Sequence, residues 1–174
     1  MKSKIVHCAL ALAGGSLALF FAFATSAQTT LFSDNFQDGD QSGWSRSGGT
    51  WTVVTDGSLV LRQSGTSADA RARAGSTSWT DYSVQARVKP IAFNGAGRYV
   101  ALMARAENVN HFYYLALQNG NQLVLAKRAG DTSTTLASKA FTVTTGTFFT
   151  LRIDVRGSSL TRSEEHTSEL QSQR

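Results

Sequence analysis

The richest run of side chains able to do chemistry is the segment SDNFQDGDQSGW, which brings together Asp34, Asp38 and Asp40. Carboxylate oxygens in a flexible, glycine-containing turn suit calcium, a hard cation that takes oxygen ligands. The spacing departs from that of an EF-hand loop, and a solvated acidic turn without metal is the alternative interpretation. We expect these three aspartates to be the ligands if the protein binds calcium, which is the one cofactor that the sequence suggests.

Catalytic side chains are scarce between residues 28 and 161. This part holds one glutamate, Glu107, one histidine, His111, and no cysteine. A conventional glycosidase needs two carboxyl groups that flank the scissile bond, and no E-x-D-x-x-E run is present. Glu107 and His111 are the first and last residues of the segment ENVNH and could form an acid–base pair across this turn, but a plain polar turn is the alternative. The sequence therefore assigns no catalytic residue and leaves open whether the protein is an enzyme.

The N-terminal residues have the pattern of a signal peptide. Lys2 and Lys4 precede the apolar run CALALAGGSLALFFAFA, and TSAQ supplies small residues for cleavage after Ala27. A membrane anchor is the alternative, because the run approaches the roughly 17 residues that span a bilayer. We expect residues 1–27 to be removed and the protein to be secreted, extracellular or periplasmic, with no membrane partner afterwards. The secreted part then contains no disulfide, because the only cysteine is Cys8.

The charge of the chain is modest. Its formal net charge is +5, and charged residues make up 17% of the sequence. This balance, together with the expected secretion, argues against nucleic acid as a partner. An anionic ligand outside the cell remains open.

Alternation of apolar and polar residues predicts β-strands almost throughout residues 50–157. In the run YSVQARVK (82–89) every second residue is apolar, as in a strand with one wet face. Similar runs occupy residues 50–55, 58–63, 98–107, 111–118, 122–128 and 148–157. The segments TDGS, QNGNQ, RAGDTS and VRGSS supply hairpin-turn residues between them, and Pro90 is expected to end the strand before it. The pattern indicates an all-β, antiparallel β-sandwich or jelly roll.

Strand register predicts which side chains face outward. The more apolar sets should form the core: Val100, Leu102, Ala104, Tyr113, Leu115, Leu117, Leu123 and Leu125. If the strands are sheet neighbours, the opposite face mixes aromatic rings and cations, and its candidate carbohydrate-binding residues are Arg87, Tyr99, Arg105, Phe112, Tyr114, Gln118 and Arg128. Aromatic rings can cover a sugar face, and arginine matches a carboxylate. An acidic polysaccharide would suit this face. The alternative is that these residues only keep a sheet surface soluble.

The runs DNFQDGDQSGWSRSGGTWTVVTDGSLVLRQSG, ARAGSTSWTDYSVQARVKPIAFNGAGRYVALMARAENVNHFYYLALQNGNQLVL and TGTFFTLRIDVRGSSL resemble the concanavalin A-like, laminin-G-like sandwich module. The resemblance covers residues 31–160. Such modules accompany secreted bacterial polysaccharide-degrading enzymes, among them pectate lyases. The resemblance implies a concanavalin A-like jelly roll that is a non-catalytic carbohydrate-binding or accessory module, with a linked catalytic domain outside this chain. A glycoside hydrolase of sandwich fold, similar to keto-disaccharide hydrolases or family 16 enzymes, and a structural or adhesive domain are the alternatives.

The C-terminal run RSEEHTSELQS departs abruptly in composition from what precedes it. Back-translated, it fits codon by codon a widely used short-read sequencing adapter. We therefore expect residues 162–174 to be adapter-derived and disordered or spurious, and residues 28–161 to be a sandwich truncated before its last strands.

Overall fold

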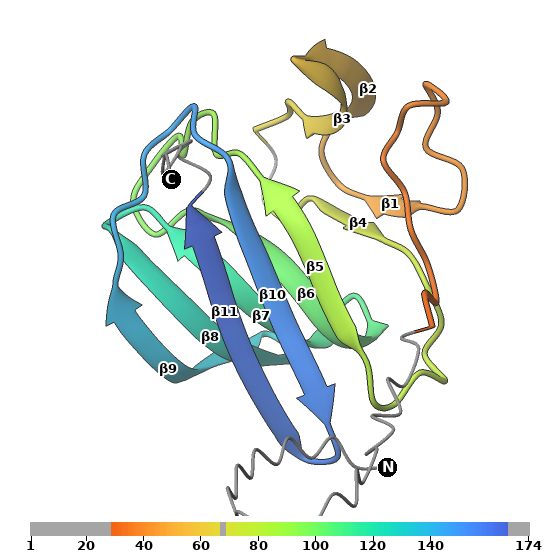
Figure 1. Ribbon diagram of the computed structural model, residues 1–174. Coiled ribbons are helices and arrows are strands. Elements are labelled where there is room, and N and C mark those ends of the chain that lie inside the picture. The colour runs from red at the N-terminus through yellow and green to blue at the C-terminus, as the bar shows by residue number, and fades with distance from the viewer. Residues whose placement is uncertain (1–28, 67–68, 167–174) are drawn as a thin grey trace, which may run out of the picture. The chain divides into compact units, whose positions relative to one another are not determined.

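The computed structural model describes residues 29–66 and 69–166, in which all regular secondary structure is β (Figure 1). The strands are β1 (Ser45–Ser47), β2 (Trp51–Asp56), β3 (Ser58–Gln63), β4 (Arg71–Arg73), β5 (Ser83–Val88), β6 (Tyr99–Asn108), β7 (His111–Gln118), β8 (Gln122–Ala129), β9 (Thr132–Ala140), β10 (Phe149–Arg156) and β11 (Ser159–His166). They belong to a compact unit that begins at Phe32. The predicted signal peptide, residues 1–27, lies outside the described residues. Within those residues no helix capable of crossing a membrane is found.

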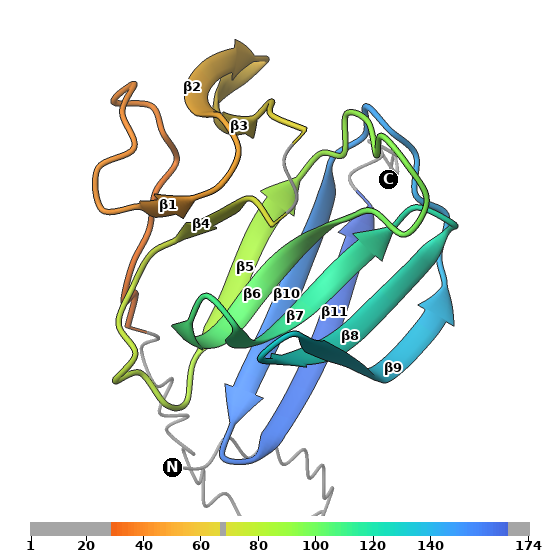
Figure 2. The same ribbon diagram turned by 180° about the vertical axis from the view of Figure 1, so that it is seen from behind.

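Two sheets form the sandwich. One has the strand order β6-β7-β8-β9 and the other β11-β10-β5, while β1 pairs with β4 and β2 with β3 in two short ribbons. Every one of these pairs is antiparallel. Figures 1 and 2 show the two larger sheets as layers lying face to face. The predicted all-β, antiparallel sandwich is confirmed.

The core lies between the two sheets and follows the alternation of the sequence. Phe149, Leu151, Ile153 and Val155 occupy every second position of β10 and are fully buried. They pack against Leu102, Ala104, Leu115, Leu117, Leu123 and Leu125 of the facing sheet, with Val84, Ala86 and Val88 of β5 at the margin. Removal of this apolar surface from water is the main stabilising contribution to such a fold. The buried sets predicted on β6, β7 and β8 are thus confirmed, with Val100 and Tyr113 only partly buried.

The predicted turns join the predicted hairpins. Gly57, with φ of +75°, connects β2 to β3, and Gly120 and Asn121, also at positive φ, connect β7 to β8. β5 ends at Val88, shortly before Pro90, as expected. Register in these hairpins therefore follows from local turn chemistry.

Three strands carry little sequence signal. β9 is a largely exposed edge strand of small and hydroxyl-bearing residues, and β1 and β4 have three residues each. An edge strand with little buried surface has no apolar alternation to reveal it.

β11 reaches into the segment that the sequence assigns to an adapter. Its register places Leu160 opposite Val155, Arg162 opposite Ile153 and His166 opposite Phe149. Residues 162–166 belong to β11, and residues 167–174 lie outside the described part. Backbone pairing needs no particular side chain, so the strand does not test the origin of the segment, which stays a prediction.

Candidate functional site

The outer face of the β6–β9 sheet carries a second apolar cluster. Phe112, Tyr114 and Ala116 of β7 pack with Val124 and Ala126 of β8 on this face. The sequence correctly separates Phe112 and Tyr114 from the main core, but each is only 6% exposed. The expectation that both rings are open to a ligand is therefore wrong.

A strand of the short ribbons contributes to covering this cluster. The guanidinium of Arg71 lies 5.5 Å from the centroid of the Phe112 ring. Asp69 forms ion pairs with Arg71 at 3.2 Å and with Arg128 at 3.7 Å. Arg128 also donates from Nε to the carbonyl oxygen of Gly130. The fork of Arg128, predicted to meet a carboxylate of a ligand, is thus engaged by a carboxylate of the protein.

Tyr99 is the exposed end of the aromatic face. Its side chain is 43% exposed, and its ring stacks on Tyr114 with centroids 5.4 Å apart. Partial burial, followed by the nearby Tyr114 and Asp69, raises the pKa of the Tyr99 hydroxyl. Gln118 lies directly opposite Tyr99 in the β6–β7 register. Of the predicted face, Tyr99 and Gln118 are the pair that the structure brings together at the surface.

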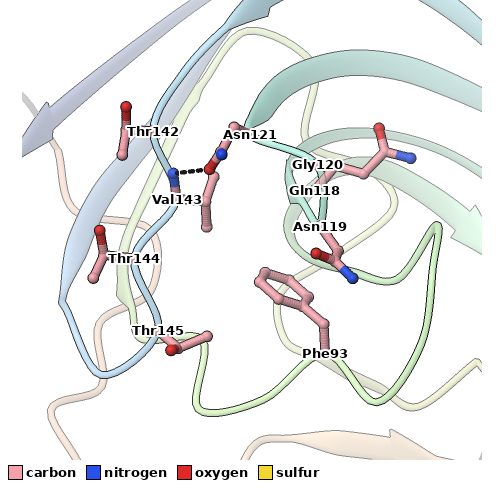
Figure 3. Close-up of a pocket in the computed structure, with 9 residues that line it drawn as sticks. All are labelled: Phe93, Gln118, Asn119, Gly120, Asn121, Thr142, Val143, Thr144 and Thr145. Atoms are coloured by element: carbon pink, nitrogen blue, oxygen red, sulfur yellow. Dashed lines mark hydrogen bonds between the residues drawn. The ribbon is translucent and has the colours of Figure 1, made fainter.

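A pocket of about 500 Å³ adjoins this pair (Figure 3). Its walls come from the β5–β6 loop, the β7–β8 turn and the β9–β10 loop. The lining residues are Phe93, Gln118, Asn119, Gly120, Asn121, Thr142, Val143, Thr144 and Thr145. Gln118 therefore connects the aromatic face with the pocket.

Hydrogen bonds tie the three walls together. Asn119 donates from Nδ2 to the carbonyl oxygen of Gly95 at 2.8 Å. The Oδ1 atom of Asn121 accepts from the backbone N–H of Val143 at 2.9 Å, and Gly146 donates to the carbonyl oxygen of Pro90 at 2.8 Å. The two asparagine amides are held in fixed orientations, and each uses only one end in these contacts.

Two predicted residues lie elsewhere. β5 pairs with β10 in the other sheet, so Arg87 is not a neighbour of Tyr99, and its guanidinium lies over Phe148 at 4.5 Å. Arg105 lies within the irregular segment of β6 between Ala104 and Asn108, has φ of +49°, and donates to the carbonyl oxygen of Gly157. The prediction that Arg87 and Arg105 share one face with the aromatic residues is wrong, because sheet partnership and the bulge redirect them.

The acidic segment forms turns in which the aspartates bond to their own backbone. Asp34 accepts from the N–H of Phe36 and from the indole of Trp44, both at 2.7 Å. Asp38 accepts from the N–H of Asp40, and Asp40 from that of Ser42. Within the described residues no group of three metal-ligating side chains is present. The three carboxylates as placed do not fit one calcium site, and calcium binding stays a prediction.

The segment ENVNH is a polar turn. His111 lies opposite Asn108, and its Nδ1 is 3.0 Å from Oδ1 of Asn108. The same oxygen accepts from the N–H of Asn110 at 2.8 Å. The contacts of His111 are thus those of a capped turn rather than of an acid–base pair with Glu107.

Sequence reasoning missed Phe93, Asn119, Asn121 and Thr145 as site residues. They lie in loops or turns, where no periodicity marks a function. The sequence signal for this site was the run QNGNQ, because a hairpin turn does not need four amide side chains.

No protein-family model matches the chain. Over 134 residues it is 29% identical to an extracellular exo-α-L-arabinofuranosidase of Streptomyces chartreusis, in a match that spans 76% of this chain and 16% of that enzyme. The chain thus spans about one sixth of the length of this curated relative. Its fold is similar to that of the carbohydrate-binding module CBM66 from Bacillus subtilis, with a TM-score of 0.57 and 18% identity over 72% of this chain and 80% of the module. The architecture shared with that module is the antiparallel β-sandwich.

Proposed function

We propose that the protein is a secreted, non-catalytic carbohydrate-binding module that serves a polysaccharide-degrading enzyme. The observation that carries this proposal is the pocket at the β7–β8 turn, with amide and hydroxyl side chains, one aromatic ring and the exposed Tyr99 beside it. Aromatic surface combined with a few oriented polar groups is the usual composition of a small-ligand site.

Two similarities support the proposal. The solved structure of similar fold is a carbohydrate-binding module. The curated relative is an extracellular glycoside-cleaving enzyme of which the match spans only 16%, a share that suits an accessory part rather than a whole enzyme. Secretion of this chain, and its attachment to a catalytic domain, are parts of the same proposal.

Binding suits the pocket better than hydrolysis. The residues that line it include no aspartate or glutamate. Glycosidases of the usual kind need an acid and a nucleophile or base, both carboxyl groups. A site of amides and hydroxyls can hold a sugar but does not supply these groups.

A more specific version of this proposal is that the protein is a concanavalin A-like or laminin-G-like module of the kind found with pectate lyases. It takes an acidic polymer as the ligand, held by arginines on an aromatic face. The structure separates Arg87 and Arg105 from that face and pairs Arg128 with Asp69. Binding of an acidic polysaccharide is therefore tested beside binding of neutral ones.

The test is retention of the purified chain on insoluble or immobilised polysaccharides: arabinan, arabinoxylan, cellulose and polygalacturonate. An unrelated protein of similar charge serves as the control. We expect saturable retention on at least one polymer, released by its soluble oligosaccharides. Retention no greater than that of the control on the whole panel would contradict the proposed function.

A further inference from the structure

The lining of the pocket is electrically neutral. None of its nine residues carries a titratable side chain. An amide offers both donors and an acceptor, which matches the hydroxyl groups of a sugar, since each of these also donates and accepts. A carboxylate placed there would lose hydration without gaining an opposite charge, which is unfavourable.

The side-chain amides of Asn119 and Asn121 are oriented before any ligand arrives. The contact of Asn119 with Gly95 leaves Oδ1 of Asn119 as an acceptor, and the contact of Asn121 with Val143 leaves Nδ2 of Asn121 as a donor. The backbone of Gln118 pairs with Tyr99 and Gln122 in the sheet, and its side-chain amide, part of the pocket lining, can bond a ligand. Groups fixed beforehand lose little conformational freedom on binding, which favours affinity.

Two aromatic rings offer apolar faces at different positions. Phe93 is part of the pocket lining, and Figure 3 shows its ring pointing into the space between the turn and the facing loop. Tyr99 lies outside, opposite Gln118, and is exposed. A sugar unit in the pocket would contact the Phe93 ring, and Tyr99 offers a second, exposed aromatic surface opposite Gln118.

From these contacts we infer that the pocket selects an uncharged sugar unit, and that Gln118, Asn119 and Phe93 determine this selectivity. The inference rests on the proposed function and narrows its ligand to neutral polysaccharides. The neighbouring cation Arg98, whose carbonyl oxygen accepts from the N–H of Asn119, is not part of the lining and takes no part in recognition.

The experiment compares arabinan with polygalacturonate, each at low and high salt, by isothermal titration calorimetry. The variants are Gln118→Ala and Phe93→Ala in the pocket, Arg98→Gln beside it, and Gln85→Ala on an exposed position of β5 in the other sheet. The melting temperature of each variant shows that it is folded. Gln118→Ala keeps the inference testable if Phe93→Ala does not fold.

We expect arabinan binding that is insensitive to salt and about tenfold weaker in Gln118→Ala and Phe93→Ala, with Arg98→Gln and Gln85→Ala unchanged. Salt-sensitive binding of polygalacturonate that Arg98→Gln abolishes would overturn the inference but keep the proposed function. Arabinan binding that neither Gln118→Ala nor Phe93→Ala weakens would also overturn the inference but keep the proposed function. No binding of either polymer, nor of the rest of the panel, would overturn both.

Discussion

Tyr99 and Tyr114 stack with their ring planes 12° from parallel, although their backbone positions are four residues apart in the β6–β7 register. The pair Ala101 and Ala116 lies between them in that register. These small side chains leave room for the two rings to meet above them, which accounts for the burial of Ala116. One ring of the stack is thus structural, and the other faces solvent.

This division predicts unequal costs of truncation. Tyr114→Ala should lower the free energy of unfolding by about 3 kcal/mol, because it opens a cavity in a buried cluster. Tyr99→Ala should cost about 1 kcal/mol or less, because its ring is half exposed and contributes chiefly the stacking contact. Chemical denaturation of both variants measures the difference, and equal losses would contradict it.

The Arg152–Asp154 pair predicts a dependence of stability on acid. Arg152 donates from Nη2 to Oδ1 of Asp154 at 2.6 Å and from Nε to both carboxylate oxygens at 3.0 and 3.1 Å, and Ser83 donates a further hydrogen bond. The bonds from Arg152 lower the pKa of Asp154, against a smaller opposing effect of burial. The stabilisation is therefore present above the ordinary carboxyl pKa of 3.8 and is lost as the pH falls through the lower, folded-state pKa.

Asp154→Asn should consequently be less stable than the parent at neutral pH, by about 1 kcal/mol or less because the pair is partly exposed. Its disadvantage should shrink as the pH falls below 3.8. Thermal melts of both proteins between pH 2 and 7 measure this, and a constant difference across the range would rule out the linkage.

Much of the sandwich follows from the sequence, because a strand that is buried on one face alternates and a strand that is buried on both faces is a nearly continuous apolar run. The fully buried positions of β10 alternate along the strand, whereas β7 and β8 are buried on both faces and are nearly continuous apolar runs. Alternation assigns a residue to a face but not a strand to a sheet. β5 precedes β6 in the chain yet pairs with β10, and this long-range choice removed Arg87 from the predicted site.

Two further tertiary contacts explain why predicted residues do not lie at the site. The N–H of Arg105 donates to the hydroxyl of Tyr82 at 2.6 Å, a tertiary contact beside the bulge in β6. The outer face of β7 is buried by contacts such as that of Arg71 with Phe112, which come from a ribbon with almost no sequence signal. Strand periodicity contains no information on either contact.

Replacing Gly75 by alanine should strongly lower the free energy of unfolding. Gly75 has φ of +96°, and a Cβ there would clash with the Trp79 ring, which in turn contacts Tyr82. Gly57 is the matched control, with φ of +75° and no atom within 4 Å of such a Cβ. Gly57→Ala should cost about 1–2 kcal/mol from the backbone alone, and Gly75→Ala about 1–3 kcal/mol more from the clash. Denaturation midpoints and tryptophan fluorescence test this; similar losses would show that the ring moves aside freely.

The hydrogen bonds of the acidic turn lead us to expect that the stability of the protein does not depend on calcium. Both carboxylate oxygens of Asp34 accept hydrogen bonds from the protein, so we expect the same melting temperature with excess calcium and with chelator. Asp34→Ala should be destabilised by about 1 kcal/mol through loss of these bonds. A rise in melting temperature with calcium that Asp38→Asn and Asp40→Asn remove would instead establish the calcium site.

Replacing Arg162 by an apolar residue should stabilise the fold. Residues directly opposite in an antiparallel pair share a face, and Arg162 stands opposite the fully buried Ile153, two residues after Leu160, which packs against the core. An arginine there can bury its stem but must keep its guanidinium in water. Arg162→Val should raise the free energy of unfolding by about 0.5–1 kcal/mol, whereas Ser163→Val, at the adjacent position opposite Arg152, should not. Equal effects of the two substitutions would indicate that β11 does not hold this register, since only a fixed register distinguishes the two faces of the strand.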